Sequence, residues 1–334
     1  MAHTNAIDPA KLATRIQHKE RAAVAVALNL IDNVLPAARQ QATQLLSALS
    51  DAKSHSEGHV IGITGPPGAG KSSLVAALIR QWRRAGQTVA VLAVDPSSRP
   101  ELGGGALLGD RIRIKNTVAD DGLFIRSLAS RNELGGVTSG VWPMSWILLS
   151  CFDRVVVETV GVGQTEIDIA EVSDTVCYVA QPASGDTIQY LKSGIMEIPD
   201  VFAVNKSDLG PAAHKTAAEI TRAAEKPDHR AGWSYPVCLV SATQNEGIEQ
   251  LAEAIAEHRS FLQRSGILGQ QRACHQRNWI YRQLKAEFGS FGVQIAGGPE
   301  AIEQRLARQS FNPFAQYESI RRSIASQFIP QPET

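Results

Sequence analysis

The chain has 334 residues, enough for one α/β domain of about 200 residues plus smaller additions. Hydrophobic residues make up 43% of the chain, and Lys plus Arg equals Asp plus Glu at 33 each, which is typical of a globular protein. The formal net charge of zero gives no general attraction to nucleic acid or to anionic membranes, so we expect neither as a partner.

The cysteines and the longest apolar stretch indicate an intracellular setting. The four cysteines are far apart and form no C-x-x-C pair, as is usual in a reducing compartment. The apolar stretch at residues 141–152 is interrupted by Pro143 and is too short to span a bilayer. The first 20 residues include Asp8 and lack the apolar core of a secretory signal, so we expect a cytoplasmic protein.

Residues 1–57 are expected to form an N-terminal helical segment. From Asp8 to about Ala52, apolar residues recur at spacings of three and four. This periodicity predicts two or three amphipathic helices, broken near Pro36.

Residues 58–260 are expected to form an α/β domain. Short runs rich in β-branched residues alternate there with helical stretches, which predicts a mostly parallel sheet covered by helices on both faces. The predicted strands are residues 59–64, 88–94, 154–159, 175–180, 201–204 and 237–240.

Residues 261–334 are expected to form a C-terminal helical extension, interrupted at residues 289–299. Its apolar spacing is helical, and the chain provides no further strand signal there. The expected core positions are Trp279, Ile280, Leu284, Phe288, Ile302, Leu306, Ile320 and Ile324.

A phosphate-binding loop follows the first predicted strand. The residues from Gly65 to Ser72 read GPPGAGKS, a match to G-x-x-x-x-G-K-[ST], and a helical stretch follows. In such loops the backbone N–H groups surround the phosphates, the lysine reaches the β and γ oxygens, and the hydroxyl binds Mg²⁺. The motif by itself does not distinguish ATP from GTP. The expected nucleotide contacts are Gly65, Pro66, Pro67, Gly68, Ala69, Gly70, Lys71, Ser72 and Ser73.

A guanine-recognition element follows the strand at residues 201–204. It reads Asn205-Lys206-Ser-Asp208, at the strand end where ligands bind in open α/β sheets. The Asp208 carboxylate can accept from the guanine N1–H and exocyclic amine, whereas adenine would leave it unpaired. A later strand ends in Ser241-Ala242-Thr243, whose N–H groups could contact the guanine oxygen.

Acidic residues near other strand ends are candidates for Mg²⁺ binding and for positioning water. Asp95 follows one predicted strand, Glu158 ends another, and Asp110 lies in a glycine-rich segment where an ordinary turn is the alternative. Gly161 would let its N–H contact the γ-phosphate. We assign Lys71, Asp95 and Glu158 to catalysis, and Ser72, Asp95, Asp110 and Glu158 to the metal.

Seven motifs together resemble the MeaB/ArgK family of P-loop GTPases, also called the methylmalonic aciduria type A family. They are GITGPPGAGKSS from Gly62, VAVLAVDPSS from Val89, GD at Gly109, LGGV from Leu134, VVVETVGVGQTE from Val155, SGDTIQYLKSGI from Ser184 and VNKSD from Val204.

The resemblance implies a GTP-dependent chaperone for an adenosylcobalamin-dependent acyl-CoA mutase, with GTP/GDP and Mg²⁺ as ligands. It implies a partner-sensing switch at residues 181–195, which includes Asp186, Gln189 and Lys192. It also implies a homodimer formed through the C-terminal helices. Three departures from the family pattern, after Ser98, at residues 127–132 and at residues 183–184, lie in the switches and leave the nucleotide motifs whole.

Two other functions stay open. One is a kinase acting on a periplasmic amino-acid-binding transport protein, although no H-R-D-type catalytic loop is present. The other is a metal-insertion GTPase, which would need clustered ligands. His3, His18, His55 and His59 are scattered in the sequence.

Overall fold

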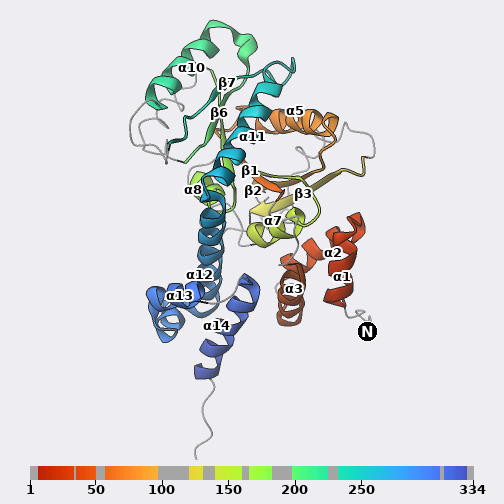
Figure 1. Cartoon of the computed structure of the whole chain (residues 1–334), viewed down its shortest axis with the longest axis vertical. Coiled ribbons are helices and arrows are strands. Elements are labelled where there is room, and N and C mark those ends of the chain that lie inside the picture. The colour runs from red at the N-terminus through yellow and green to blue at the C-terminus, as the bar shows by residue number, and fades with distance from the viewer. Residues whose placement is uncertain are drawn as a thin grey trace, which may run out of the picture. The chain divides into compact units, whose positions relative to one another are not determined.

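The computed structural model describes residues 7–33, 35–49, 57–96, 120–130, 140–159, 165–182, 198–224, 232–308 and 312–328. The chain forms two compact units, shown in Figure 1. The helical unit comprises residues 1–56, 142–151 and 270–334, and the sheet unit comprises residues 57–141 and 152–269. Each unit is described by itself below.

The sheet unit is built on a seven-stranded sheet with the order β3-β2-β4-β1-β5-β6-β7, in which every pairing is parallel. This arrangement confirms the predicted α/β fold with a parallel central sheet. The strands are β1 His59–Thr64, β2 Val89–Pro96, β3 Leu123–Ser130, β4 Arg154–Glu158, β5 Thr175–Ala180, β6 Val201–Val204 and β7 Val237–Leu239.

Strand β3 was not among the strands predicted from the sequence. It pairs with β2 in register from Leu123 opposite Val89 to Ser130 opposite Pro96, and it forms one edge of the sheet. Its centre contains Arg126 and Ser127, which weaken the apolar signal that marks a buried strand. An edge strand has only one neighbour and tolerates such residues.

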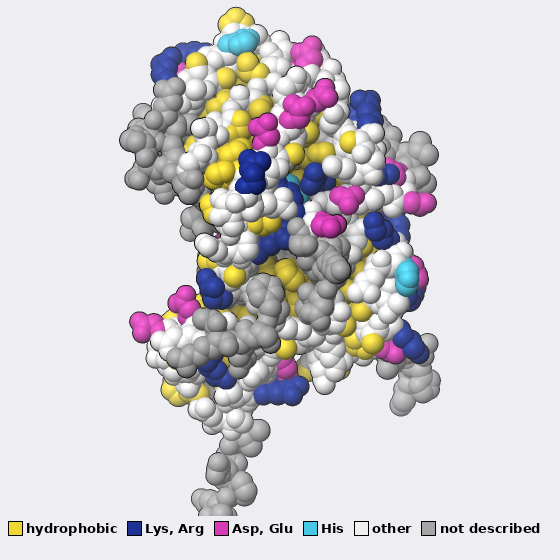
Figure 2. Space-filling model, in the orientation of Figure 1, with side chains coloured by type: hydrophobic (Ala, Val, Ile, Leu, Met, Phe, Trp, Pro, Cys, Tyr) yellow, Lys and Arg dark blue, Asp and Glu magenta, His cyan; other side chains and the backbone are white. Residues whose placement is uncertain are grey.

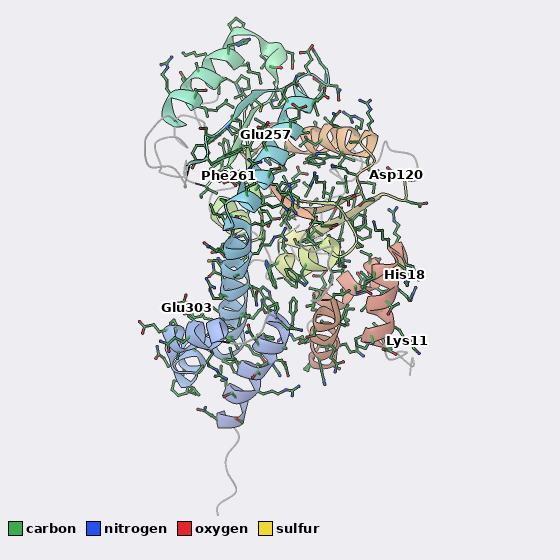
Figure 3. All side chains as sticks on the ribbon, in the orientation of Figure 1. Lys11, His18, Asp120, Glu257, Phe261 and Glu303 are labelled. Atoms are coloured by element: carbon green, nitrogen blue, oxygen red, sulfur yellow. The ribbon has the colours of Figure 1, made fainter. Side chains whose placement is uncertain are left out.

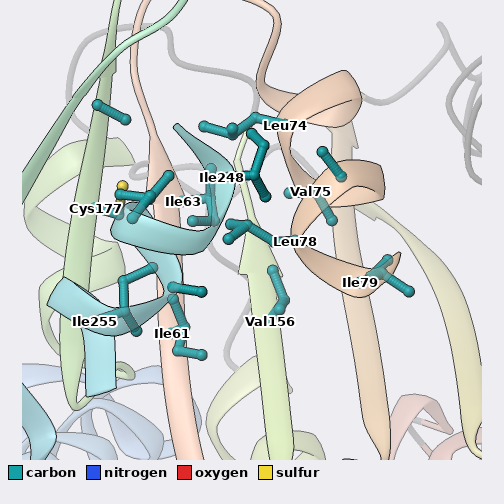
Figure 4. Close-up of a cluster of buried hydrophobic side chains, with 14 of the residues drawn as sticks. Ile61, Ile63, Leu74, Val75, Leu78, Ile79, Val156, Cys177, Ile248 and Ile255 are labelled. Atoms are coloured by element: carbon teal, nitrogen blue, oxygen red, sulfur yellow. The ribbon is translucent and has the colours of Figure 1, made fainter. Parts of the chain in front are cut away.

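Helices cover both faces of the sheet. They are α5 Lys71–Arg84, α8 Thr165–Ala170, α10 Pro211–Ala224 and α11 Ile248–Arg264, with the short 3-10 helix η3 Ser207–Leu209. Helices α5 and α11 pack Leu78 and Ile255 onto Ile61 and Val156 of the sheet, as Figure 4 shows. On the opposite face, α10 packs Ile220 against a second cluster of buried side chains on β5 and β6.

A buried polar network fastens α11 to the start of the sheet strands. The Thr175 hydroxyl lies 2.7 Å from His59 Nε2 and 2.8 Å from His258 Nδ1. His258 Nε2 lies 3.5 Å from the Asp200 carboxylate, and all four side chains are buried. His258 lies one turn before Phe261 on α11, and Phe261 is labelled in Figure 3. A hydroxyl can donate to one imidazole nitrogen and accept from the other, so Thr175 bridges the two rings.

The helical unit joins helices from both ends of the chain with one from the middle. They are α1 Pro9–Gln17, α2 Arg21–Asp32, α3 Pro36–Leu49, α7 Val141–Leu149, α12 Ile267–Ile295, α13 Gly298–Arg308 and α14 Pro313–Phe328, of which α7 and α12 begin in the sheet unit. The break between α2 and α3 lies beside Pro36, the first residue of α3. Proline suits the start of a helix because the N–H groups of the first turn have no partner within the helix, so the absence of one costs nothing there. Helix α12 is kinked at Gly289, whose φ of 68° is left-handed.

Aromatic rings form one cluster in this unit. The Trp142 ring of α7 lies 5.1 Å from Trp279 and 5.6 Å from Phe314 between centroids. Ile280 and Ile320 belong to a neighbouring cluster of the C-terminal helices, as the apolar spacing predicts.

The surface carries charges of both signs, which are interspersed on the face in view in Figure 2. Within the described ranges, no helix has the length and apolar character needed to cross a membrane.

Candidate nucleotide-binding site

The loop between β1 and α5 needs glycine at three positions. Gly65, Gly68 and Gly70 have φ angles of 143°, 78° and 87°. A Cβ on Gly65 would collide with the carbonyl oxygen of Val179, and one on Gly70 would collide with the Asn205 amide. The glycines therefore allow both the loop's turn and the close approach of its neighbours.

Lys71 begins α5 and folds its side chain back over the loop. Its Nζ donates to the carbonyl oxygens of Gly65 at 2.8 Å and Pro66 at 3.1 Å, and only 8% of the residue is exposed. The ammonium is thus held inside the loop, at the N-terminal end of a 14-residue helix, where anions are favoured. Ser72 and Ser73 follow in the first turn.

Ser72 and Glu158 meet although they are 86 residues apart in sequence. The Ser72 hydroxyl donates to Glu158 Oε1 at 2.6 Å. Glu158 is the last residue of β4, where it lies in register with Ile63 of β1, and it is buried. A hydroxyl oxygen beside a carboxylate provides hard oxygen ligands, so these two residues fit a Mg²⁺ ion.

Asn205 connects three loops. Its Nδ2 donates to the carbonyl oxygens of Ala69 at 2.8 Å and Gly70 at 3.4 Å, and its Oδ1 accepts from the Ala242 N–H at 3.2 Å. The residue is 2% exposed and directly follows β6. One side chain thereby fixes the phosphate loop against the two loops that follow β6 and β7.

Lys206 and Asp208 lie beside Asn205. Lys206 adopts φ 60°, and its Nζ donates to the Gly68 carbonyl at 2.8 Å. Asp208 Oδ1 accepts from the Ser241 hydroxyl at 2.7 Å, and Ser241 Oγ lies 3.2 Å from the Thr243 hydroxyl. The second Asp208 oxygen remains available in this geometry, so the carboxylate can accept from a base edge.

Other predicted site residues are described only in part or not at all. The backbone of Asp95 pairs with Ala129 at the end of β2, and its side chain is outside the described residues. Asp110, Gly161, Asp186, Gln189 and Lys192 also lie outside the described residues.

Two residues that were not assigned to the nucleotide pocket also lie at the site, and one of them, Gln181, is the first residue of the switch segment that the family resemblance implies. The Thr159 hydroxyl donates to the Thr64 hydroxyl at 3.1 Å, which joins the ends of β4 and β1. Gln181 directly follows β5, and a Cβ on Gly68 would lie 3.6 Å from its Oε1. Its position at a strand end, the same as that of Asn205 after β6, is a signal that could have identified Gln181.

The family model described as "Methylmalonyl Co-A mutase-associated GTPase MeaB" matches residues 24–290. The chain belongs to the MeaB family of GTPases.

Relatives of this MeaB-family chain support the same classification. It is 38% identical to a putative GTPase of Pyrococcus abyssi over 94% of this chain and 96% of the relative. It is 33% identical to the GTPase ArgK of Escherichia coli, with 82% of each chain covered. A methylmalonic aciduria type A homolog of Caenorhabditis elegans is 32% identical over 84% of this chain and 73% of the relative.

A solved structure shares the fold. The crystal structure of a LAO/AO transport system kinase matches with a TM-score of 0.69 and 25% identity, covering 95% of this chain and 97% of that one. The predicted family is thus confirmed, and the MeaB-family chain is a GTPase that binds GTP and GDP.

Proposed function

We propose that this GTPase docks on an adenosylcobalamin-dependent acyl-CoA mutase of the methylmalonyl-CoA type. In this proposal it gates loading of the mutase cofactor and protects or reactivates the mutase. The match over residues 24–290 to a mutase-associated GTPase carries the proposal, and the name of the methylmalonic aciduria type A homolog supports it.

The phosphate loop and Lys71 bind and orient the triphosphate in this proposal. Lys71 exchanges its two carbonyl acceptors for β and γ oxygens, because charged acceptors give stronger hydrogen bonds. Ser72 and Glu158 would hold Mg²⁺ directly or through water, together with Asp95 and Asp110. When bound, the ion would neutralise the negative charge that develops on the phosphate oxygens during hydrolysis. Gly161 provides an N–H for the γ-phosphate.

Asp208 selects guanine in the same proposal. The Ser241 hydroxyl donates to one Asp208 oxygen and fixes the orientation of the carboxylate. Each carboxylate oxygen has two lone pairs, so one oxygen can accept from the guanine N1–H and the other from the exocyclic amine. Asn205 and Lys206 hold this loop against the phosphate loop, so recognition of the base and binding of the phosphates occur in one rigid frame.

The partner-facing parts of the proposal come from the family resemblance. Asp186, Gln189 and Lys192 form the switch that senses the mutase, and the C-terminal helices form a homodimer. GTP hydrolysis would then be slow alone and faster in the complex, because partner contacts complete the transition-state site.

The test compares GTP turnover with and without an adenosylcobalamin-dependent mutase from the same genome. The expected result is stimulation by the mutase and a preference for GTP over ATP that is lost in Asp208→Asn. Asp121→Asn is the matched control, because Asp121 is an exposed carboxylate in the turn before β3 and belongs to none of the nucleotide motifs. A lack of both stimulation and complex formation would exclude that mutase as the partner and leave the GTPase activity standing.

The name of the solved neighbour favours one second candidate, a kinase of a transport-binding protein. Labelled γ-phosphate distinguishes the two functions. Release of label as inorganic phosphate supports the switch, and label on an added amino-acid-binding protein supports the kinase.

A further inference from the structure

The helical unit contains a cavity of about 530 Å³ between α3 and the C-terminal helices α12 and α14. Small-molecule sites usually enclose roughly 300–1,000 Å³, so this cavity has the size of a metabolite site. It is separate from the nucleotide site, because none of its lining residues belongs to the phosphate loop or the guanine element. Its charged and phenolic lining residues are Arg39, Glu287, Tyr317, Glu318, Arg321 and Arg322.

Two carboxylates and two arginines on its wall neutralise each other. Glu287 accepts from the Tyr317 hydroxyl at 2.8 Å and from Arg321 Nε at 2.9 Å. Glu318 accepts from Arg322 Nε at 2.9 Å and lies 3.5 Å from an Arg321 terminal nitrogen. These pairs fix the donors and acceptors on α12 and α14 in place.

Arg39 is the third arginine of the cavity and comes from α3. Three guanidinium groups against two carboxylates leave one net positive charge on the lining. Within the described parts of the chain, no hydrogen bond or ion pair of the Arg39 guanidinium is found, and the residue is exposed.

The charge of Arg39, on α3, acts on the Tyr317 hydroxyl of α14. Burial raises the pKa of Tyr317, and its hydrogen bond to Glu287 raises it further, whereas Arg321 and Arg39 act in the opposite direction. Tyr317 is therefore a neutral phenol at physiological pH, and it adds no negative charge that would offset Arg39.

We propose that this cavity binds a small organic anion whose carboxylate or phosphate group pairs with Arg39. The guanidinium fork is suited to both groups, since each presents two oxygens for parallel hydrogen bonds. An inorganic ion would fill only a small part of the volume, so the ligand carries an organic body beside its charged group. Such a ligand would bridge α3 to α14, and the hydrogen bond between Ser47 and Asn312 at 3.4 Å already links the same parts of the chain.

The test is isothermal titration of the full chain with succinate and with glycerol 3-phosphate, after the nucleotide site has been filled with GDP and Mg²⁺. Fluorescence provides a second readout, because the Trp279 ring lies 5.5 Å from that of Tyr317. Arg39→Gln is expected to weaken binding by about tenfold or more, the usual effect of losing one charge-assisted hydrogen bond. Glu318→Gln is expected to strengthen it, because it raises the net charge.

Arg222→Gln is the matched control, an exposed arginine of α10 in the sheet unit. It should bind both probes as the unchanged chain does. Stronger binding of glycerol 3-phosphate would identify a phosphate ligand, and stronger binding of succinate a carboxylate. The proposal is overturned if neither probe binds, if Arg39→Gln binds like the control, or if only an acidic peptide such as polyglutamate binds.

Discussion

Replacing Asn205 with alanine tests whether one buried amide holds the nucleotide site together. The change removes hydrogen bonds to the Ala69 carbonyl at 2.8 Å and from the Ala242 N–H at 3.2 Å, and a longer contact to Gly70 at 3.4 Å. Two good bonds contribute about 1–3 kcal/mol, and leaving their buried partners unsatisfied adds to this, so we expect a loss of about 2–4 kcal/mol. Water entering the space would bring the loss toward the lower value.

The same change should weaken GDP binding by about 10–100-fold, because the phosphate loop and the guanine loop would no longer be preorganised together. Urea unfolding measures the stability, and titration with a fluorescent GDP analogue measures the affinity. Gln244→Ala is the control, since this exposed amide lies in the loop after β7, and it should change stability by less than about 0.5 kcal/mol. An Asn205→Ala protein that matched this control in both assays would refute the reasoning.

Three further predictions address the core, the thiols and the metal. Thr175→Val should lower the free energy of unfolding by about 2–4 kcal/mol because two buried imidazoles lose their shared hydroxyl. Thr221→Val, at an exposed position of α10, should change it by less than about 0.5 kcal/mol. Burial raises the pKa of Cys151 from 9.0 to about 12, so its contribution to stability is full below pH 9 and lost as the pH approaches 12. Iodoacetamide should accordingly modify exposed Cys274 in the native protein and Cys151 only after unfolding. Mass spectrometry of quenched samples measures both, and modification of Cys151 before Cys274 in the native protein would contradict the prediction. Ser72→Ala should lower GTP turnover by about 10–100-fold and shift its Mg²⁺ dependence to higher concentration, and an unchanged Mg²⁺ titration would remove Ser72 from the metal site.

The sequence by itself determined the fold class and the family. Short β-branched runs that alternate with helical periodicity predict a sheet covered by helices, and six of the seven strands in the described residues were located in this way. The phosphate loop was identifiable because its glycines serve local backbone geometry, which depends on adjacent residues and is therefore visible in a short motif. The same locality explains why Pro36 marked a helix start.

Other features were decided only by the tertiary structure. Strand β3 owes its place to pairing with β2, and its own residues give a weak signal. The bond between Ser72 and Glu158 depends on β4 lying next to β1, and strand order is set by packing between distant segments. Periodicity shows that a helix has an apolar face, and it cannot show which helix covers that face.

The helical unit shows the same limit. Helix α7 is apolar except for Ser145, so its sequence indicates burial. Only the folded chain shows that Trp142 packs with Trp279 and Phe314. The cavity lined by Arg39 needs α3 and α14 side by side, although Ser47 of α3 and Asn312 beside α14 are 265 residues apart in sequence. Local conformation depends on residues that are close in sequence, so it can be predicted from a short segment. A site formed by long-range contacts depends on which apolar faces pack together, and that is determined only in the folded chain.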